Sequence, residues 1–232
     1  MSEIQTLAKQ ISDDRFVSRG KGDKTKLTIV NAALEFLWSH PFREMNVSLL
    51  MSKTGIARSA FYQYFDDLYQ LMEYMMNRLE QEIMQEASDW FNGHGNPVEL
   101  LQNSLKRTVN VFYFRGPLIS AIADAAATDV RVEQAWQGMI DRFDAAVLRR
   151  VQADQELGLI RRFDSKLLVV ALNRMDAFTC IWAFGKHPRQ EMSPIADVFI
   201  QVWVSTLYGD EYLYSEKPPL CRPGEQNTPA DA

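Results

Sequence analysis

Hydrogen-bond donors gather in a short stretch of the chain between residues 48 and 64. The side chains concerned, with one small residue among them, are Ser48, Lys53, Arg58, Ser59, Ala60, Tyr62, Gln63 and Tyr64. Hydroxyl groups and cationic side chains donate to phosphate oxygens, and a glutamine amide can pair with an adenine edge through two hydrogen bonds. A surface that displays these groups together would therefore suit double-stranded DNA.

Apolar residues around this stretch recur at helical spacing and predict short helices at 47–54 and 58–65. The residues expected to face inward are Val47, Leu50, Met51, Phe61 and Phe65. Gly55 stands between the helices, and a glycine there can adopt the left-handed conformation that ends a helix sharply. The pattern indicates a helix-turn-helix, whose second helix enters the major groove. A helical hairpin inside an ordinary bundle, with the aromatic residues as core, fits the spacing equally well.

Each donor has a distinct expected role in the helix-turn-helix interpretation. Ser59 and Ala60 begin the second helix, where backbone N–H groups and the helix dipole favour a phosphate. Gln63 is the candidate for reading a base, and Tyr62 and Tyr64 are candidates for phosphate contacts that position the helix. The further expected phosphate contacts are Arg43, Ser48, Lys53 and Arg58, with Ser48 as an alternative cap of the first helix.

Charge is distributed unevenly along the 232 residues, of which 47% are hydrophobic and 24% are charged. Nine basic and six acidic side chains lie within residues 1–65, so this part carries +3 although the whole chain carries −5. A basic front on an acidic body is typical of a DNA-binding head joined to a different domain. A solvated basic tail gives the same imbalance.

The rest of the chain also follows helical periodicity, and no period-two alternation predicts strands. The expected helices cover residues 23–40, 47–54, 58–65, 66–91, 97–115, 118–127, 129–157, 164–185 and 193–208. Asp23 and Asp66 are expected N-caps, and Gly116-Pro117 is an expected break. The predicted fold is all-α with about nine helices. It comprises a flexible basic arm (1–22), a DNA-binding domain (23–68), a ligand-binding and dimerisation domain (69–209) and a disordered tail (210–232).

No group of residues indicates an enzyme. His40, His94 and His187 stand far apart at helix ends or in turns, and the sequence holds no pattern for a metal site, a nucleophile elbow or a phosphate loop. We therefore expect no catalytic residues, no metal and no cofactor. Cys180 and Cys221 favour a reduced cytoplasmic protein over a disulfide. The apolar runs are short, so we expect no membrane span.

The helix-turn-helix resembles that of the TetR family of transcription regulators. The family pattern is a glycine followed six residues later by an aromatic run, and here Gly55 precedes Phe61-Tyr62-Gln63-Tyr64-Phe65. The resemblance extends over about residues 23–208 and implies a homodimer that binds a palindromic DNA operator. Leu68 replaces the family's lysine at the start of the fourth helix, so this head would rely more on its tyrosines and basic arm. A helical ligand carrier with a vestigial helix-turn-helix is the alternative.

The C-terminal part is similar to that of mycobacterial members of the family, most clearly at 109–112, 171–176 and 203–209. This likeness implies a tunnel-shaped pocket for an apolar or aromatic small molecule. The implied lining residues are Leu105, Phe112, Trp136, Phe143, Asn173, Asp176, Ile181 and Trp203. Asp176 replaces an asparagine and, if ionised, would favour a cationic or donor-rich ligand, unless Arg174 neutralises it. The alternative is that these aromatic residues form a packed core.

Dimerisation is expected to use the last two long helices, at about 164–184 and 194–207. The small and apolar residues on their expected contact faces are Leu167, Val170, Ala171, Phe178, Val198, Val202, Ser205 and Thr206. The expected mechanism is that of a repressor, in which the free dimer occupies its operator. Ligand binding would then move the helix at 66–91 and change the separation of the recognition helices.

Overall fold

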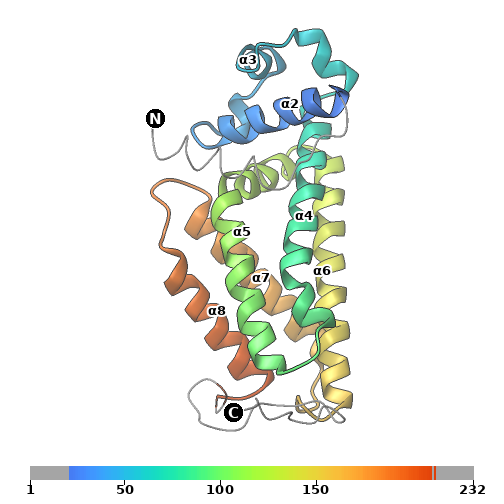
Figure 1. The fold of residues 1–232 in the computed structure, drawn as a ribbon, viewed down its shortest axis with the longest axis vertical. Helices are drawn as coiled ribbons and strands as arrows, with labels where there is room; N and C mark the ends of the chain where they lie inside the picture. Colours follow the sequence, from blue (N-terminus) through green and yellow to red (C-terminus); the bar gives the residue numbers. More distant parts are fainter. Residues whose placement is uncertain (1–20, 211, 213–232) are drawn as a thin grey trace, which may run out of the picture. The chain divides into compact units, whose positions relative to one another are not determined.

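The computed structural model describes residues 21–210 and Tyr212, and every regular element within them is helical. The elements are α2 (Lys21–Leu37), η1 (Phe42–Glu44), α3 (Val47–Ser52), η2 (Arg58–Gln63), α4 (Leu68–Asn92), α5 (Pro97–Ala126), α6 (Val130–Glu156), α7 (Ser165–Phe184) and α8 (Met192–Leu207), shown in Figure 1. The prediction of an all-α fold is confirmed. Residues 1–20 of the predicted arm, and nearly all of the predicted tail with Cys221, lie outside the described residues.

The described chain forms two compact units. Unit 1 holds residues 21–79, 114–137 and 184–187, and unit 2 holds residues 80–113, 138–183 and 188–210. The helices α4, α5 and α6 each contribute a segment to both units. The predicted boundary at residue 68 separates a DNA-binding domain from a ligand-binding and dimerisation domain. It divides the chain by function, and it stays a prediction.

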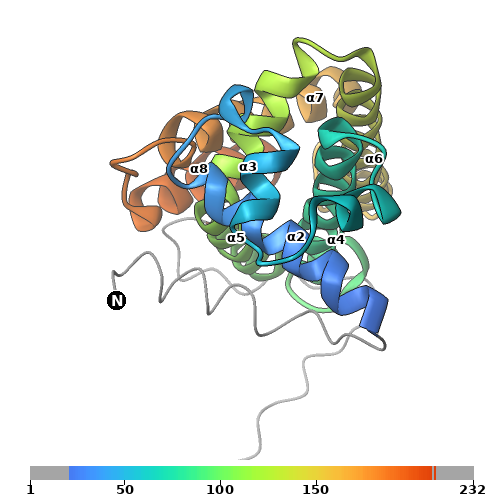
Figure 2. The same cartoon turned by 90° about the horizontal axis from the view of Figure 1, so that it is seen from above.

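In unit 1, α2 supplies the apolar face on which the helix-turn-helix packs, and α3 lies against it (Figure 2). Its buried residues include Ile29, Val30, Ala33 and Phe36. Their spacing places them on one face of a helix. The helix begins at Lys21, two residues before the predicted Asp23 cap, and ends at Leu37. Pro41 has no N–H and cannot extend it, so residues 38–40 form a turn instead of the predicted last helical turn.

The start of α4 is fixed by a reciprocal cap. Asp67 Oδ1 accepts a hydrogen bond from the N–H of Gln70 at 2.8 Å, and Gln70 Oε1 accepts one from the N–H of Asp66 at 2.7 Å. This arrangement satisfies donors that the first helical turn leaves without a partner. The predicted cap, Asp66, is therefore wrong by one residue, since the capping carboxylate belongs to Asp67.

The helix α5 runs through Gly116 and Pro117, where the sequence predicted a break and a separate helix at 118–127. Gly116 packs so tightly that a Cβ there would lie 2.1 Å from the carbonyl oxygen of Phe184. Pro117 provides no N–H for the carbonyl of Tyr113, one turn earlier. Arg189 Nη1 donates to that carbonyl at 2.8 Å, and its guanidinium lies 3.9 Å from the Tyr113 ring centroid. A tertiary hydrogen bond therefore replaces the missing helical one.

Unit 2 is a helical bundle tied by polar contacts between neighbouring helices (Figure 1). Arg107 of α5 donates to Asp89 of α4 at 2.8 Å. Arg142 of α6 binds Glu80 of α4 through Nε and Nη2, at 2.5 and 2.6 Å. Gly158 follows α6 with φ +74°, as the predicted helix end requires. The last helix, α8, begins at Met192, slightly before the predicted start at Ser193-Pro194, and Pro194 is tolerated in its first turn.

By length and composition α7 could cross a membrane, with 28% of its most apolar window buried inside the structure. We expected no such segment, because apolar runs such as 167–172 are short and flanked by polar residues. Cys180, on the same helix, is fully buried, whereas Phe178 and Trp182 are each 68% exposed. One face of α7 therefore belongs to the core of unit 2, and the other is an exposed apolar face.

Candidate nucleic-acid interface and effector site

The turn of the helix-turn-helix has the predicted geometry. Gly55 adopts φ +69°, a left-handed conformation that a residue with a Cβ rarely takes. Thr54 Oγ1 donates to the carbonyl of Met51 at 2.8 Å and accepts from the N–H of Ile56 at 3.1 Å. These two bonds hold the turn on both sides of the glycine.

The cap of α3 is Asn46, whose Oδ1 accepts a hydrogen bond from the N–H of Leu49 at 2.9 Å. The alternative that Ser48 caps this helix is therefore wrong, because the residue before Val47 already supplies the acceptor. Ser48 lies within α3 with its side chain exposed. It stays a candidate for a phosphate contact.

The second helix of the pair is the 3-10 helix η2, where the sequence predicted an α-helix at 58–65. Phe61 is fully buried and Phe65 is nearly so, which confirms the prediction that both face inward. Their rings lie 5.5 Å apart between centroids. Ala57 occupies the N-cap position and makes no side-chain cap bond. A buried aromatic pair therefore fixes the element, and its opposite face is left available.

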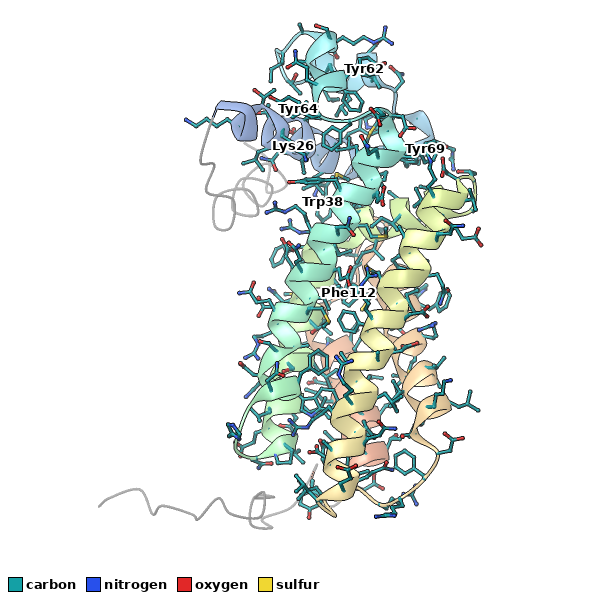
Figure 3. All side chains as sticks on the ribbon, turned by 90° about the vertical axis from the view of Figure 1, so that its right-hand side faces the viewer. Lys26, Trp38, Tyr62, Tyr64, Tyr69 and Phe112 are labelled. Atoms are coloured by element: carbon teal, nitrogen blue, oxygen red, sulfur yellow. The ribbon has the colours of Figure 1, made fainter. Side chains whose placement is uncertain are left out.

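The side chains predicted to contact DNA belong to α3, η2 and the residues that follow each of them. The exposed ones are Ser48, Lys53, Arg58, Ser59, Tyr62 and Gln63, whereas Ala60 and Tyr64 are half-buried. Arg58 Nη2 donates to the Tyr62 hydroxyl at 3.2 Å, so these two side chains form one polar group. Figure 3 shows how Tyr62 and Tyr64 lie on the helix-turn-helix.

Leu68, in the position of the family's lysine, is the first residue of α4 and is half-buried. The neighbouring carboxylate of Asp67 pairs with Arg131 Nη2 at 2.9 Å, and Arg131 also pairs with Asp129 at 2.7 Å. The hydrogen bond from Arg131 lowers the pKa of Asp129 to about 2. Lys26 of α2 is labelled in Figure 3. Its Nζ lies 3.9 Å from the centroid of the Tyr74 ring, a cation–π interaction.

The predicted effector residues are only partly brought together. Trp203 Nε1 donates to Asp176 Oδ2 at 2.9 Å, which joins α8 to α7. Phe143 lies beside Phe91, with 6.5 Å between ring centroids. Leu105 is buried, and Phe112 and Ile181 are half-buried in the same unit. Trp136 belongs to unit 1, apart from the other seven, which all belong to unit 2.

Asn173 is engaged by a carboxylate of α6. Its Nδ2 donates to Asp144 Oδ1 at 2.7 Å, and Arg174 pairs with the same carboxylate at 3.1 Å. The suggestion that Arg174 neutralises Asp176 is therefore wrong, because the Arg174 guanidinium pairs with Asp144 of α6 instead.

Burial sets the protonation of Asp176. Its Oδ1 is fully buried and accepts no hydrogen bond from the described residues. Burial raises its pKa to about 8, against a smaller opposite effect of the Trp203 hydrogen bond. At neutral pH the group is therefore mostly a neutral carboxylic acid, which can donate as well as accept. The expectation that an ionised Asp176 favours a cationic ligand therefore does not apply at neutral pH.

The sequence analysis missed a buried polar cluster in unit 2, formed by Trp90, Arg150, Asp154 and Tyr208. Arg150 Nε lies 2.8 Å from Asp154 Oδ2, and both side chains are at most 1% exposed. The Tyr208 hydroxyl donates to Asp154 Oδ2 at 2.7 Å and accepts from Trp90 Nε1 at 3.2 Å. Arg150 Nη1 donates to the carbonyl of Trp90. The spacing of four between Arg150 and Asp154 was visible in the sequence, but its burial was not.

An all-α fold with a helix-turn-helix and an exposed donor face is the arrangement that DNA-binding transcription regulators use. The family model described as "Transcriptional regulator EthR, C-terminal domain" matches residues 101–209. The HTH-type transcriptional regulator EthR of Mycobacterium tuberculosis is 26% identical over 207 residues, which cover 84% of this chain and 93% of that protein.

Solved structures share the fold. The TetR-family regulator PfmR of Thermus thermophilus has a TM-score of 0.61 at 13% identity and covers 75% of this chain and 96% of its own. A complex of triclosan with SmeT, the repressor of the Stenotrophomonas maltophilia efflux pump SmeDEF, has a TM-score of 0.66 at 15% identity, covering 86% and 99%. Together with the EthR matches, these structures show that the chain is similar to TetR-family transcription regulators, among them EthR.

Proposed function

We propose that this regulator is a cytoplasmic repressor, which occupies a palindromic operator as a homodimer and is released by an apolar small molecule. The observation that carries the DNA-binding part is the outer face of η2 and its turn. Exposed hydroxyl, amide and cationic donors stand there on a buried aromatic support, the arrangement that a recognition helix needs. In this proposal Gln63 reads a base, and Ser59, Tyr62 and Arg58 contact phosphates.

Dimerisation is proposed to cover the exposed apolar faces of α7 and α8. Leu167, Phe178 and Trp182 on α7 are 73%, 68% and 68% exposed, and Val198 on α8 is 52% exposed. Residues 167, 171, 178 and 182 recur at spacings of four and seven and thus form one stripe. Large apolar side chains at such exposure mark an interface. Trp182 was not among the predicted contact residues.

The effector is proposed to bind in unit 2 near Asp176 and Trp203. Seven of the eight expected lining residues belong to that unit, and the neutral carboxylic acid of Asp176 offers Oδ1 as a hydrogen-bonding group among apolar side chains. The SmeT structure with triclosan supports an apolar, aromatic ligand in this fold. A ligand with a carbonyl acceptor would satisfy Asp176 better than a cation would.

Release from DNA is proposed to pass through α4. The helix is continuous from Leu68, next to the helix-turn-helix, to Asn92. Near its far end the ring of Trp90 lies 6.0 Å from that of Trp203, edge to face. A ligand that prefers one position of Trp203 would therefore bias the position of α4.

The test of the DNA-binding proposal is selection of bound DNA from a random pool with the full chain. We expect a palindromic sequence with two half-sites, because the dimer presents two recognition elements. Recovery of unselected sequence only would contradict the proposal and favour a ligand carrier with a vestigial helix-turn-helix.

The test of the dimer is Phe178→Asp, measured by sedimentation. A charge placed in an apolar interface leaves an unpaired group to be buried, so we expect the variant to be monomeric. Lys166→Asp, at the start of the same helix but outside the stripe, is the control and should stay dimeric. A dimeric Phe178→Asp protein would place the interface elsewhere.

A further inference from the structure

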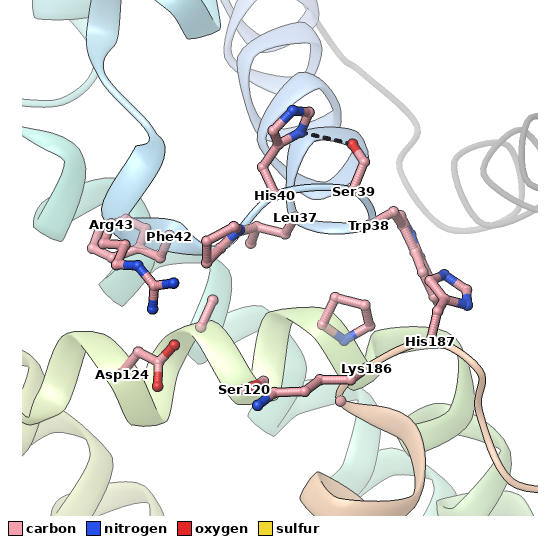
Figure 4. A pocket seen from close by; sticks show the side chains of 14 residues that line it. Leu37, Trp38, Ser39, His40, Phe42, Arg43, Ser120, Asp124, Lys186 and His187 are labelled. Carbon is pink, nitrogen blue, oxygen red and sulfur yellow. Dashed lines mark hydrogen bonds between the residues drawn. The ribbon is translucent and has the colours of Figure 1, made fainter.

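We propose that unit 1 contains a second binding site, for an amphipathic organic anion, beside the helix-turn-helix. The site is a pocket of about 630 Å³ between the C-terminal end of α2, η1, the second part of α5 and the residues after α7 (Figure 4). Pockets of a few hundred cubic ångströms accept drug-sized organic molecules. All of its lining residues belong to unit 1, and none is among the expected effector residues.

Part of the pocket wall is apolar. Leu37 and Phe42 come from the α2 end and η1, and Pro117 and Ala121 come from α5. All four are buried side chains, so this part of the wall is a fixed feature of the core. Because these side chains are already buried, a ligand with a hydrocarbon or aromatic body would gain free energy mainly by covering Trp38 and Pro41, which also line the pocket and are half-buried.

Two cations and one carboxylate give the pocket a net positive charge. Arg43 and Lys186 line it together with Asp124. Figure 4 shows the side chains of Arg43 and Asp124 at one end of the pocket, with those of Ser120 and Lys186 farther along it. Asp124 can balance only one of the two cations, so the other is left to attract an anion. A carboxylate or sulfonate on the ligand would serve as that anion.

An aromatic edge completes the site. The indole of Trp38 and the imidazole of His187 lie 5.6 Å apart between centroids, and both line the pocket. His40 lines it as well, and its Nδ1 lies 2.8 Å from Ser39 Oγ. A flat aromatic anion could contact the Trp38 ring and still reach Lys186.

The position of the pocket links it to DNA binding. The segment that lines it, residues 37–43, leads from α2 through η1 directly to α3. An occupant would restrict this segment and thereby the helix-turn-helix. The binding itself does not depend on the effector site proposed in unit 2, so the two can fail separately.

The experiment uses the full chain labelled with 5-fluorotryptophan, whose five tryptophans give separate ¹⁹F signals. Individual Trp→Phe variants assign the signals, and 2-naphthoate is the probe. We expect saturable movement of the Trp38 signal, with weaker binding of the neutral 2-naphthalenemethanol. A Trp38 signal that stays fixed while the Trp203 signal moves would overturn this proposal and leave the effector site in unit 2 intact.

Charge variants test the recognition of the anion. Lys186→Gln should weaken naphthoate binding at Trp38 about two- to fivefold, the size expected for a partly exposed ion pair. Lys166→Gln, a matched exposed lysine outside the pocket, should have no effect. Ser120→Phe, which fills the pocket from α5, should abolish the Trp38 shift. Equal affinity of the wild type and Lys186→Gln would overturn the assignment of an anion site.

Discussion

The helix-turn-helix and the core of unit 2 use polar side chains in opposite ways. Around η2 the polar groups are exposed, and a buried aromatic pair, Phe61 and Phe65, supports them from behind. In unit 2 the ion pair of Arg150 and Asp154 is itself buried. An exposed group can be replaced without disturbing the fold, whereas a buried charge that loses its partner destabilises the protein strongly. Substitutions should therefore affect DNA binding in the first region and stability in the second.

The largest effect is expected at the buried pair. Asp154→Ala leaves the Arg150 guanidinium uncompensated in the core and should lower the free energy of unfolding by about 3–5 kcal/mol. Urea unfolding followed by circular dichroism measures it. The double variant Arg150→Met with Asp154→Leu removes both charges and should recover most of the loss. An Asp154→Ala protein as stable as the wild type would break the comparison.

The next effect concerns DNA alone. Tyr62→Ala combined with Gln63→Ala removes one expected phosphate contact and one expected base contact, each of about 1–3 kcal/mol. Affinity for the selected operator should fall by at least about 30-fold, as measured by fluorescence anisotropy, while the unfolding midpoint stays the same. Gln85→Ala, exposed on α4, is the surface control. Undiminished operator binding by the double variant would refute the assignment of this face.

A third, smaller effect depends on pH. Asp176 is ionised above about pH 4 in the unfolded chain, but its pKa in the folded chain is about 8. Its contribution to stability is therefore complete below pH 4 and is lost as the pH rises through 8. Between pH 7 and pH 9 the wild type should lose about 1.4 kcal/mol relative to Asp176→Asn, which does not titrate. Parallel stability curves for the two proteins would show that Asp176 is ionised in the folded state.

The smallest effect is expected at an exposed pair within unit 2 itself. Arg142 binds Glu80 through two nitrogens, but its side chain is 56% exposed. Arg142→Met should lower the free energy of unfolding by only about 0.2–1 kcal/mol, and less in high salt. Arg149→Met, on the same helix, is the control. If Arg142→Met lowered the free energy of unfolding as much as Asp154→Ala does, burial of the ion pair would not explain the size of the loss.

Local patterns predicted much of the fold. The left-handed Gly55, the inward Phe61 and Phe65 and the end of α6 at Gly158 follow from residue type and spacing, because they depend on neighbours within a few positions. The break expected at Gly116-Pro117 was wrong for the converse reason. The bond that replaces the missing helical one comes from Arg189, more than seventy residues away.

The features of the candidate site also fall into two groups, those that local sequence predicts and those that depend on distant contacts. The sequence by itself determined the turn at Gly55 and the inward positions of Phe61 and Phe65, since a short helix pair carries its own pattern of inner and outer positions. Only the tertiary structure decided that Asp176 is neutral at pH 7, that Arg174 pairs with Asp144, and that Arg150 and Asp154 are buried with Tyr208. Protonation and burial depend on which distant helices exclude water from a group, and no local pattern records that.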